Sequence, residues 1–272
     1  AGASLIALLD EVTERLGFQE PIHLFVQPSA EINAFSLHAL GDRPHAISLN
    51  SGLVECMDDH ELRFVLGHEV GHLAWRHHHG RLIPLALGED EDGDSRVPPL
   101  LARRLESWDR LAELSADRAG FLASGESLAH VVPAFFKLVS GLGPQHLRFD
   151  LDAFLEQLGE LQRLERRELL ATFSHPATPV RVRALQRFGE VGGSGATPEA
   201  LLAVDAEVAQ LARLMDLQIS EPIEVHSRDF LLAGGLFAAQ VRGREIDRKQ
   251  ADWLLHLVLP LSADPEEELA RI

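Results

Sequence analysis

Apolar residues recur at helical spacing through most of this chain, and a short stretch near the N-terminus alternates as strands do. Residues 4–16 predict an amphipathic helix. Three short strands are expected next, at residues 22–27, 32–37 and 46–49, with a turn at 41–44 joining the last two. The pattern therefore predicts an α+β fold, mostly helical, with a small N-terminal antiparallel sheet packed on the helices that follow it.

A longer helix is expected over about residues 59–79. Asp58 and Asp59 precede Glu61, which is typical of an N-cap followed by an acidic first turn. Apolar residues then follow at helical spacing: Leu62, Val65, Leu66, Val70, Leu73 and Ala74. One face of this helix should therefore be buried in the core.

The same helix carries the pattern H-E-x-x-H at residues 68–72. His68 and His72 lie one turn apart and project from one face, so their imidazoles can bind a single zinc ion, with Glu69 beside them as a general base. The alternative is a pair of core histidines bonded to carbonyl groups. That alternative leaves a buried Glu69 without a reason.

A catalytic zinc site needs a third protein ligand, and Glu113 is the candidate. It lies on a predicted helix over residues 100–123. Asp117 lies one turn further along the same face, where it can accept the free ring N–H of a zinc-bound histidine and fix its tautomer. The alternative is an exposed acidic face. Small residues between the two carboxylates, Ser115 and Ala116, favour close packing against another helix.

These motifs together resemble the zinc metallopeptidase (gluzincin) family that includes the CAAX prenyl protease and the HtpX heat-shock protease. The resemblance rests on four ordered marks: Gly67–His72, Glu113–Arg118, Asn33–Phe35, and Ser174–Pro176 followed by Arg181. It implies one zinc ion per chain, bound by the two histidines and the later glutamate. Familiar relatives have apolar spans beside the zinc helix, and this chain has no segment of the roughly 20 apolar residues needed to cross a bilayer. It therefore resembles the soluble members.

The resemblance also suggests how a peptide is bound. Asn33, Ala34 and Phe35 are expected on an edge strand that pairs with extended substrate through main-chain hydrogen bonds. His175 is implied as the donor to the developing oxyanion, with Arg181 as a second candidate and a substrate-binding residue. His175 can alternatively be a turn residue before Pro176.

The amino-acid composition limits which binding partners, cellular compartment and oxyanion donor are expected. Twenty-five basic against 42 acidic residues give a net charge of −17, which disfavours nucleic acid and anionic lipid and favours basic or neutral peptides. A single cysteine excludes an internal disulfide and suits a reducing compartment, so a cytoplasmic protein is expected. No tyrosine is present, so an oxyanion donor other than a phenol is needed.

Two polar segments invite metal interpretations. His77, His78 and His79 are read as solvated residues that complement the helix C-terminal dipole, with a second metal site as the alternative. The acidic segment at 88–95 is read as a mobile surface loop, because a calcium loop registered on Gly93 would place Pro99 where an acid is required.

The chain is expected to divide into a metallopeptidase domain (1–188), a glycine-rich flexible linker (189–198) and a helical accessory domain (199–272). Residues 242–247 weakly resemble the turn of TerB-like helical modules, although Arg244 stands where an acid is usual. A plain packing or oligomerisation module that binds a partner or a second copy is the alternative.

The sequence thus predicts a zinc-dependent endopeptidase acting on peptide or protein substrates. The competing hypothesis is a catalytically latent, zinc-stabilised scaffold that acts through its C-terminal helices. The intact Glu69 weighs against the scaffold, because a structural zinc site needs no general base.

Overall fold

The structure is a computed structural model. It describes residues 2–39, 41–88, 97, 99–147, 150, 151, 153–156 and 175–213, together with isolated positions between 226 and 237. The acidic segment 89–95, residues 157–174, the TerB-like turn and most of 199–272 lie outside the described residues. Predictions for those segments stay predictions.

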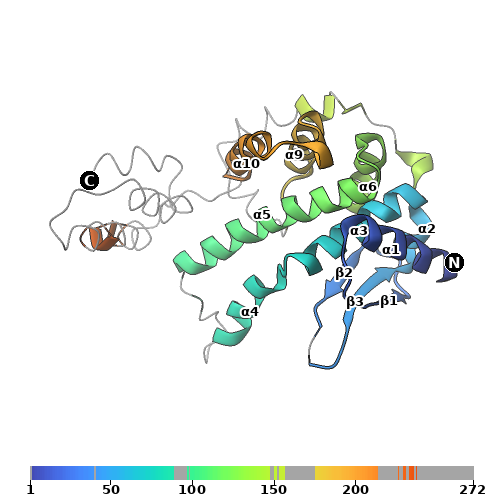
Figure 1. Ribbon diagram of the computed structural model, residues 1–272, viewed down its shortest axis with the longest axis horizontal. Coiled ribbons are helices and arrows are strands. Elements are labelled where there is room, and N and C mark those ends of the chain that lie inside the picture. The colour runs from blue at the N-terminus through green and yellow to red at the C-terminus, as the bar shows by residue number, and fades with distance from the viewer. Residues whose placement is uncertain are drawn as a thin grey trace.

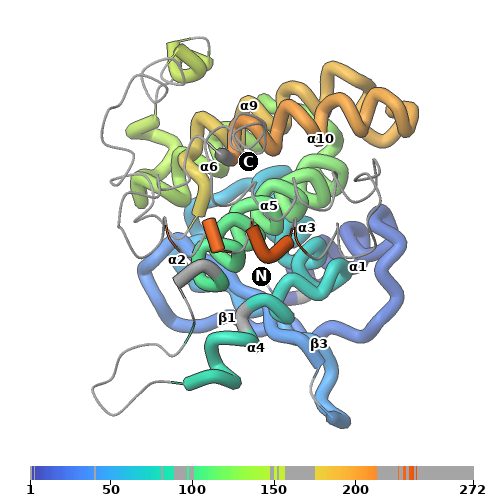
Figure 2. The backbone as a smooth tube through the Cα atoms, turned by 90° about the vertical axis from the view of Figure 1, so that its left-hand side faces the viewer, coloured from blue at the N-terminus to red at the C-terminus, as the bar shows by residue number. Residues whose placement is uncertain are grey.

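The described elements form layers (Figure 1). A three-stranded sheet lies against helices α1 and α3, α3 packs on the long helix α5, and α9 and α10 cover α5 on the other side (Figure 2). The elements and their bounds are α1 (Gly2–Leu16), β1 (Ile22–Gln27), β2 (Ala34–Leu37), β3 (His45–Asn50), α2 (Ser51–Cys56), α3 (Asp59–Ala74), α4 (His78–Leu87), α5 (Pro99–Ala123), α6 (Leu128–Ser140), η1 (Pro144–His146), α9 (Thr178–Glu190), η2 (Gly193–Gly195) and α10 (Pro198–Arg213).

The predicted α+β class is confirmed, but the prediction of a purely antiparallel sheet is wrong. The strand order is β1-β3-β2, with β3 parallel to β1 and antiparallel to β2. β3 takes the centre because it is the most buried strand, with Ile47 and Leu49 fully inaccessible. β2 runs in the direction opposite to β1. β3 lies between them and reverses direction again through the turn at 41–44, so it runs parallel to β1. β2 is left at an edge of the sheet.

Helix α3 begins as its sequence predicts and ends earlier. The Asp58 side chain accepts hydrogen bonds from the backbone N–H groups of His60 and Glu61, and the Glu61 carboxylate accepts one from the Asp58 backbone N–H, which forms a capping box. Lys137 of α6 donates to the same Glu61 at 2.6 Å in a buried ion pair. The helix stops at Ala74 rather than at residue 79, because Arg76 adopts a left-handed conformation with φ of 54°.

Glycines allow α3 and α5 to approach closely. A Cβ atom at Gly67 would lie 2.5 Å from Cβ of Ala123, and one at Gly71 would lie 2.8 Å from Cβ of Ala119. No real pair of carbon atoms tolerates such distances, so a side chain at either position would force the helices apart. The close approach brings the α5 acids against the α3 histidines.

Helix α10 packs against the part of the chain that precedes the expected linker. Val204, Val208 and Ala212 form one buried cluster with Leu114 of α5 and with Val180 and Ala184 of α9. Arg118 donates to Asp205 at 2.6 Å, and Arg187 donates to Glu207. The division at 189–198 stays a prediction, and the described contacts join α10 to the layers before it.

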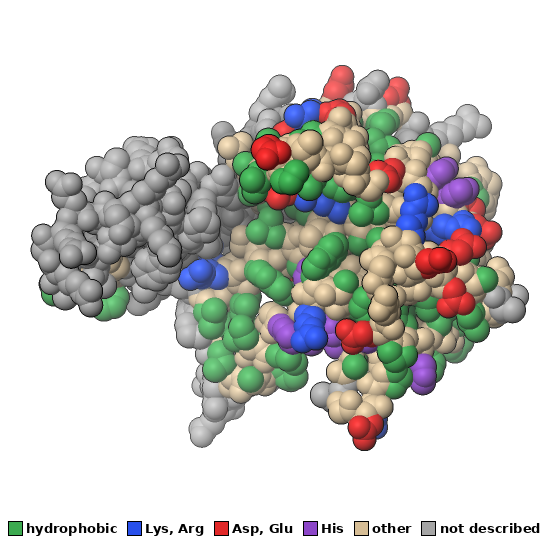
Figure 3. All heavy atoms as spheres, in the orientation of Figure 1, with side chains coloured by type: hydrophobic (Ala, Val, Ile, Leu, Met, Phe, Trp, Pro, Cys, Tyr) green, Lys and Arg blue, Asp and Glu red, His purple; other side chains and the backbone are tan. Residues whose placement is uncertain are grey.

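The exposed faces of the layers are partly apolar. Figure 3 shows hydrophobic side chains gathered over α4, where Leu82, Ile83, Leu85 and Leu87 are all exposed. None of the helices within the described ranges is both long enough and apolar enough for a transmembrane span.

Candidate metal centre

Three ligand-type side chains converge where α3 crosses α5. The Nε2 atoms of His68 and His72 are 3.0 Å apart, and they lie 3.5 and 3.4 Å from the carboxylate of Glu113. Glu113 is only 2% exposed and His68 is 8% exposed. Among the described residues this is the one group of three ligand atoms close enough together to share an ion. The structure thus brings together the three residues that the sequence singled out as zinc ligands.

The donor set fits a zinc ion. Atoms that share a tetrahedral zinc with bonds of about 2.0–2.2 Å are separated by distances of this order. Two imidazole nitrogens 3.0 Å apart cannot face each other as two lone pairs at low cost, so either a shared proton or a bound cation must relieve the repulsion between them. Two neutral imidazoles and one carboxylate are a common ligand set for catalytic zinc.

In the metal-free cluster, the pKa values of His68 and Glu113 depend strongly on their hydrogen bonds to neighbouring residues. Burial disfavours a charged His68, but its hydrogen bonds to Asp117 and Glu113 outweigh burial and raise the pKa of the imidazole to about 10. Burial acts to raise the pKa of Glu113, yet hydrogen bonds from His175, His68 and His72 hold that pKa far below its ordinary value. Without a metal the pocket therefore retains a proton at neutral pH, which a divalent cation must displace.

Asp117 lies directly behind His68. Its Oδ1 is 2.9 Å from Nδ1 of His68, and the residue is completely buried. Arg181 of α9 donates to both oxygens of this carboxylate, at 2.6 and 2.8 Å, and lies over the ring of Phe135. The pKa of Asp117 is lowered because the Arg181 guanidinium overcomes the effect of burial. Nδ1 of His68 therefore carries the proton, and Nε2 is left to face the ligand cluster.

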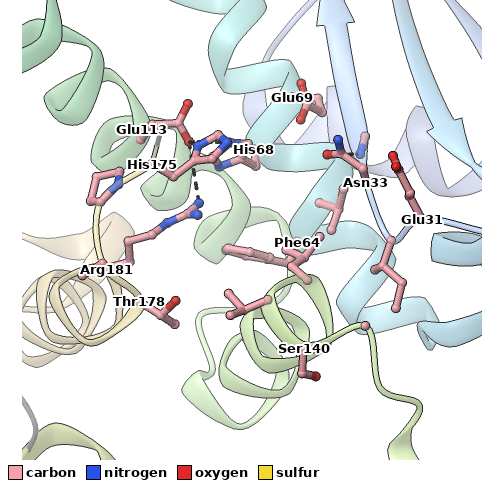
Figure 4. Close-up of a pocket in the computed structure, with 18 of the residues that line it drawn as sticks. Glu31, Asn33, Phe64, His68, Glu69, Glu113, Ser140, His175, Thr178 and Arg181 are labelled. Atoms are coloured by element: carbon pink, nitrogen blue, oxygen red, sulfur yellow. Dashed lines mark hydrogen bonds and ion pairs between the residues drawn. The ribbon is translucent and has the colours of Figure 1, made fainter. Parts of the chain in front are cut away.

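His175 lies on the opposite side of the cluster. Its Nδ1 is 2.8 Å from the carboxylate of Glu113, and its side chain is 54% exposed. Figure 4 shows His68, Glu113 and His175 converging from three separate elements, with Arg181 beneath them. The imidazole therefore contacts a candidate ligand and the open cleft at the same time.

A cleft borders the cluster on both sides. One cavity of about 1000 Å³ extends along Phe64, Leu138 and Thr178. A second, of about 660 Å³, extends past Phe35 towards α4 and α5. Both are lined by the same central residues, which are Asn33, Ala34, His68, Glu69, Glu113 and His175. Sequence reasoning did not find the α6 wall, because nothing in its apolar pattern distinguishes a cleft wall from core.

Glu69 borders both cavities and is 7% exposed. In Figure 4 its carboxylate lies between the ligand cluster and the edge strand region at Asn33. It follows His68 in the helix, so it faces the cleft beside the metal position. A carboxylate there is placed to accept a proton from a water in the cleft.

The β2 edge faces this cleft. Asn33 uses its backbone carbonyl to pair with Asn50 of β3, so the main-chain groups of Ala34 point away from the sheet. The side-chain oxygen of Asn33 accepts the Ala34 N–H at 2.9 Å. Phe35 is 40% exposed at the wall of the smaller cavity.

The interpretation of residues 77–79 as solvated needs correction for His77 and His78. The ring of His78 stacks on His38 with centroids 3.4 Å apart, and its Nδ1 is buried. Nδ1 of His77 lies 2.9 Å from Nδ1 of His72, and the ring of His77 is half-buried between Trp75 and Trp108. The early end of α3 turns the chain back onto its own last turn. A helix running to residue 79 would have carried His77 away from this position.

The chain is similar in sequence to known metallopeptidases. The family model described as "Peptidase family M48" matches residues 2–88, which include His68, Glu69 and His72 but not Glu113. The plastoglobule-localized metallopeptidase 48 of Arabidopsis thaliana is 28% identical over 198 residues, 68% of this chain and 57% of the relative. Protease HtpX of Acinetobacter baylyi is 27% identical over 226 residues, 69% of this chain and 72% of the relative. Protease HtpX of Acinetobacter baumannii is 35% identical over 83 residues, 30% of this chain. The match thus spans less than two thirds of the Arabidopsis protein. No solved structure matches the chain at a significant level.

Proposed function

Because the chain belongs to peptidase family M48, we propose that it is a zinc-dependent endopeptidase whose zinc is held by His68, His72 and Glu113. The observation that carries the proposal is the convergence of these three ligand atoms beside Glu69 in a cleft. When bound, zinc supplies Lewis acidity that makes water a better nucleophile and polarises the scissile carbonyl. Proton transfer, substrate binding and oxyanion stabilisation are carried out by side chains of the protein.

Glu69 is the general base in this proposal. It accepts a proton from the attacking water and returns it to the leaving amine, so one carboxylate serves both halves of the reaction. Its position beside His68, in the wall of both cavities, supports this role.

The substrate is an extended peptide that lies along β2. The outward main-chain groups of Ala34 offer one donor and one acceptor to such a strand. The side chain of Asn33 must release the Ala34 N–H before that donor is available. Phe35 lines the smaller cavity and Arg181 lines the larger one, and both are proposed to contact substrate side chains.

His175 is the proposed donor to the oxyanion that develops on the scissile carbonyl. It is exposed in the cleft and lies against Glu113 without belonging to the ligand cluster. Its imidazole replaces the phenol that a chain without tyrosine cannot supply. Arg181 is the second candidate, although its guanidinium is already bonded to Asp117.

The experiment that tests the proposal compares wild type with Glu69→Gln on a quenched fluorescent casein. Gln has nearly the same shape but cannot take a proton, and loss of a general base typically costs about 10²- to 10⁴-fold in rate. Glu199→Gln is the control, because Glu199 is exposed on α10 and lines neither cavity of the site. Both variants should retain zinc. Undiminished hydrolysis by Glu69→Gln would remove the residue from the mechanism, whereas absence of hydrolysis by the zinc-loaded wild type would favour the latent scaffold.

A further inference from the structure

The chain leaves α3 through a turn that returns it to the candidate ligand His72. The backbone N–H of His77 donates to the carbonyl of His72, and the N–H of Arg76 donates to that of Leu73. With Arg76 in the left-handed conformation, this is the hydrogen-bond pattern of a Schellman motif. In that motif the residue after the left-handed position contacts the third residue from the helix end. Here these two residues are His77 and His72.

The side chains of His72 and His77 make a polar contact, and His77 in turn contacts Ser115. Nδ1 of His77 is 2.9 Å from Nδ1 of His72, and its Nε2 is 3.3 Å from Oγ of Ser115 on α5. Ser115 donates its hydroxyl proton to the carbonyl of Ala112 at 2.9 Å. A chain of three hydrogen bonds therefore runs from the ring of His72 to the backbone of α5.

The donor and acceptor of each of these three hydrogen bonds can be assigned. The Ser115 hydroxyl proton is used on Ala112, so its oxygen accepts from Nε2–H of His77. A neutral His77 that carries its proton on Nε2 has a lone pair on Nδ1. That lone pair accepts a hydrogen bond from Nδ1–H of His72, and Nε2 of His72 is left unprotonated towards His68 and Glu113. This is the tautomer that a metal ligand requires at Nε2.

Packing holds in place the series of hydrogen bonds from His72 through His77 and Ser115 to Ala112, called the relay below. The indole of Trp75 stacks on the His77 ring with centroids 5.8 Å apart, and the indole of Trp108 meets it edge-on at the same distance. Trp108 also fills the space beside Gly80, where a Cβ atom would lie 2.4 Å from it. The ring of His77 therefore has little freedom to turn away from His72.

The two candidate histidine ligands consequently have different partners. His68 donates to the anionic, arginine-bound Asp117, whereas the hydrogen-bond partner of His72 is the imidazole of His77. We propose that His77, fixed by Ser115, is a positioning residue that holds His72 in the tautomer and orientation needed to bind the metal. This inference rests on the proposed zinc site and adds a residue that stands outside the H-E-x-x-H pattern.

Two substitutions separate hydrogen bonding from packing. His77→Gln retains an acceptor for Nδ1–H of His72 but has no ring, whereas His77→Phe retains a ring between the two indoles but no acceptor. His79→Ala is the matched control, because His79 belongs to the same histidine triplet and lines neither cavity of the site. Zinc affinity is measured on the full chain by competition with a chromogenic chelator, which does not depend on hydrolysis.

The proposal predicts that His77→Phe weakens zinc binding by about 10- to 100-fold, the usual effect of losing the partner of a metal-bound histidine. His77→Gln should bind zinc nearly as well as wild type, and so should His79→Ala. In the zinc-loaded wild type, nitrogen-detected NMR of labelled histidine should show the proton of His72 on Nδ1. Zinc affinity of His77→Phe equal to that of His79→Ala would overturn the proposal, and so would a His72 without a proton on Nδ1.

The outcomes also separate this inference from the proposed function. If His77→Phe loses affinity while Glu69→Gln still hydrolyses casein, the relay stands and the mechanism is wrong. If hydrolysis behaves as proposed while His77→Phe binds zinc normally, the ring of His77 serves packing alone and the relay is wrong.

Discussion

Nδ1 of His68 donates to Asp117 at 2.9 Å, on the side of the ring opposite the candidate metal position. The same carboxylate receives two hydrogen bonds from Arg181, so a ligand on α3 is connected through α5 to the start of α9. All three layers around the site therefore contribute to the orientation of one imidazole. A charged partner of this kind raises the basicity of a metal-bound histidine.

Asp117→Asn should weaken zinc binding by about 10- to 100-fold and also lower stability. The substitution removes the carboxylate that accepts two hydrogen bonds from the buried Arg181 and leaves it only the more distant Glu113, at 3.9 Å. Breaking a buried pair typically costs about 3–5 kcal/mol. Asp205→Asn is the control, because Asp205 pairs with Arg118 at the surface, where such pairs contribute about 0–1 kcal/mol. Chelator competition and urea unfolding of the metal-free proteins would measure both effects. Equal behaviour of the two variants would contradict the role given to Asp117.

Zinc binding should strengthen as pH rises from about 6.5, the ordinary pKa of histidine, towards about 10, the pKa of His68 in the metal-free protein. A raised pKa means that the folded, metal-free protein holds its proton through this range, and zinc must displace it. Each proton displaced makes the affinity change about tenfold per pH unit. Calorimetry in buffers of different ionisation enthalpy would count the protons released at pH 7. Zinc uptake without proton release would show that His68 is already neutral.

His175→Ala should reduce kcat by about 10²- to 10³-fold, the usual cost of losing one oxyanion donor. KM and zinc content should stay near those of wild type, because the donor acts on charge that exists only in the transition state. His146→Ala is a suitable control, since His146 lies in η1 and lines neither cavity of the site. Should zinc affinity fall instead, the hydrogen bond from His175 to Glu113 would be its main contribution, and the oxyanion donor would be Arg181 or the metal alone.

A chain that ends after Arg213 should fold and bind zinc, whereas one that ends at Gly195 should be less stable. The shorter chain lacks α10 and exposes Leu114, Val180 and Ala184 to water. Burial of one aliphatic side chain is worth about 1.5–3 kcal/mol, so the loss should be measurable by thermal unfolding. If the chain ending at Gly195 is as stable as the longer one, α10 belongs with residues that follow it, as the predicted boundary at 189–198 implies.

The ligand cluster could be predicted from sequence because most of its information is local. His68 and His72 share a face through helix geometry alone, and the N-cap at Asp58 sets where that helix begins. Glu113 was a candidate because it shares a helical face with Asp117, and the resemblance to a family supported that choice, since spacing alone does not show which acid on a later helix faces α3. The glycine contacts that bring α5 against α3 become visible only in three dimensions.

The remaining features depend on long-range packing and could not be predicted. Arg181 pairs with Asp117 because α9 lies against α5, and no local pattern reveals that pairing. β1 runs parallel to β3 because the most buried strand takes the middle of the sheet. His77 was misplaced because its position depends on an arginine in a left-handed conformation, where glycine is the usual signal.

The most direct test of the zinc assignment is anomalous diffraction at the zinc edge from crystals of the zinc-loaded full chain. The account predicts one peak per chain, bonded to Nε2 of His68, Nε2 of His72 and the carboxylate of Glu113, with a solvent molecule as the fourth ligand. A peak elsewhere would contradict the assignment of the site. A peak bound by these three residues and a fourth protein side chain would contradict the hydrolytic function.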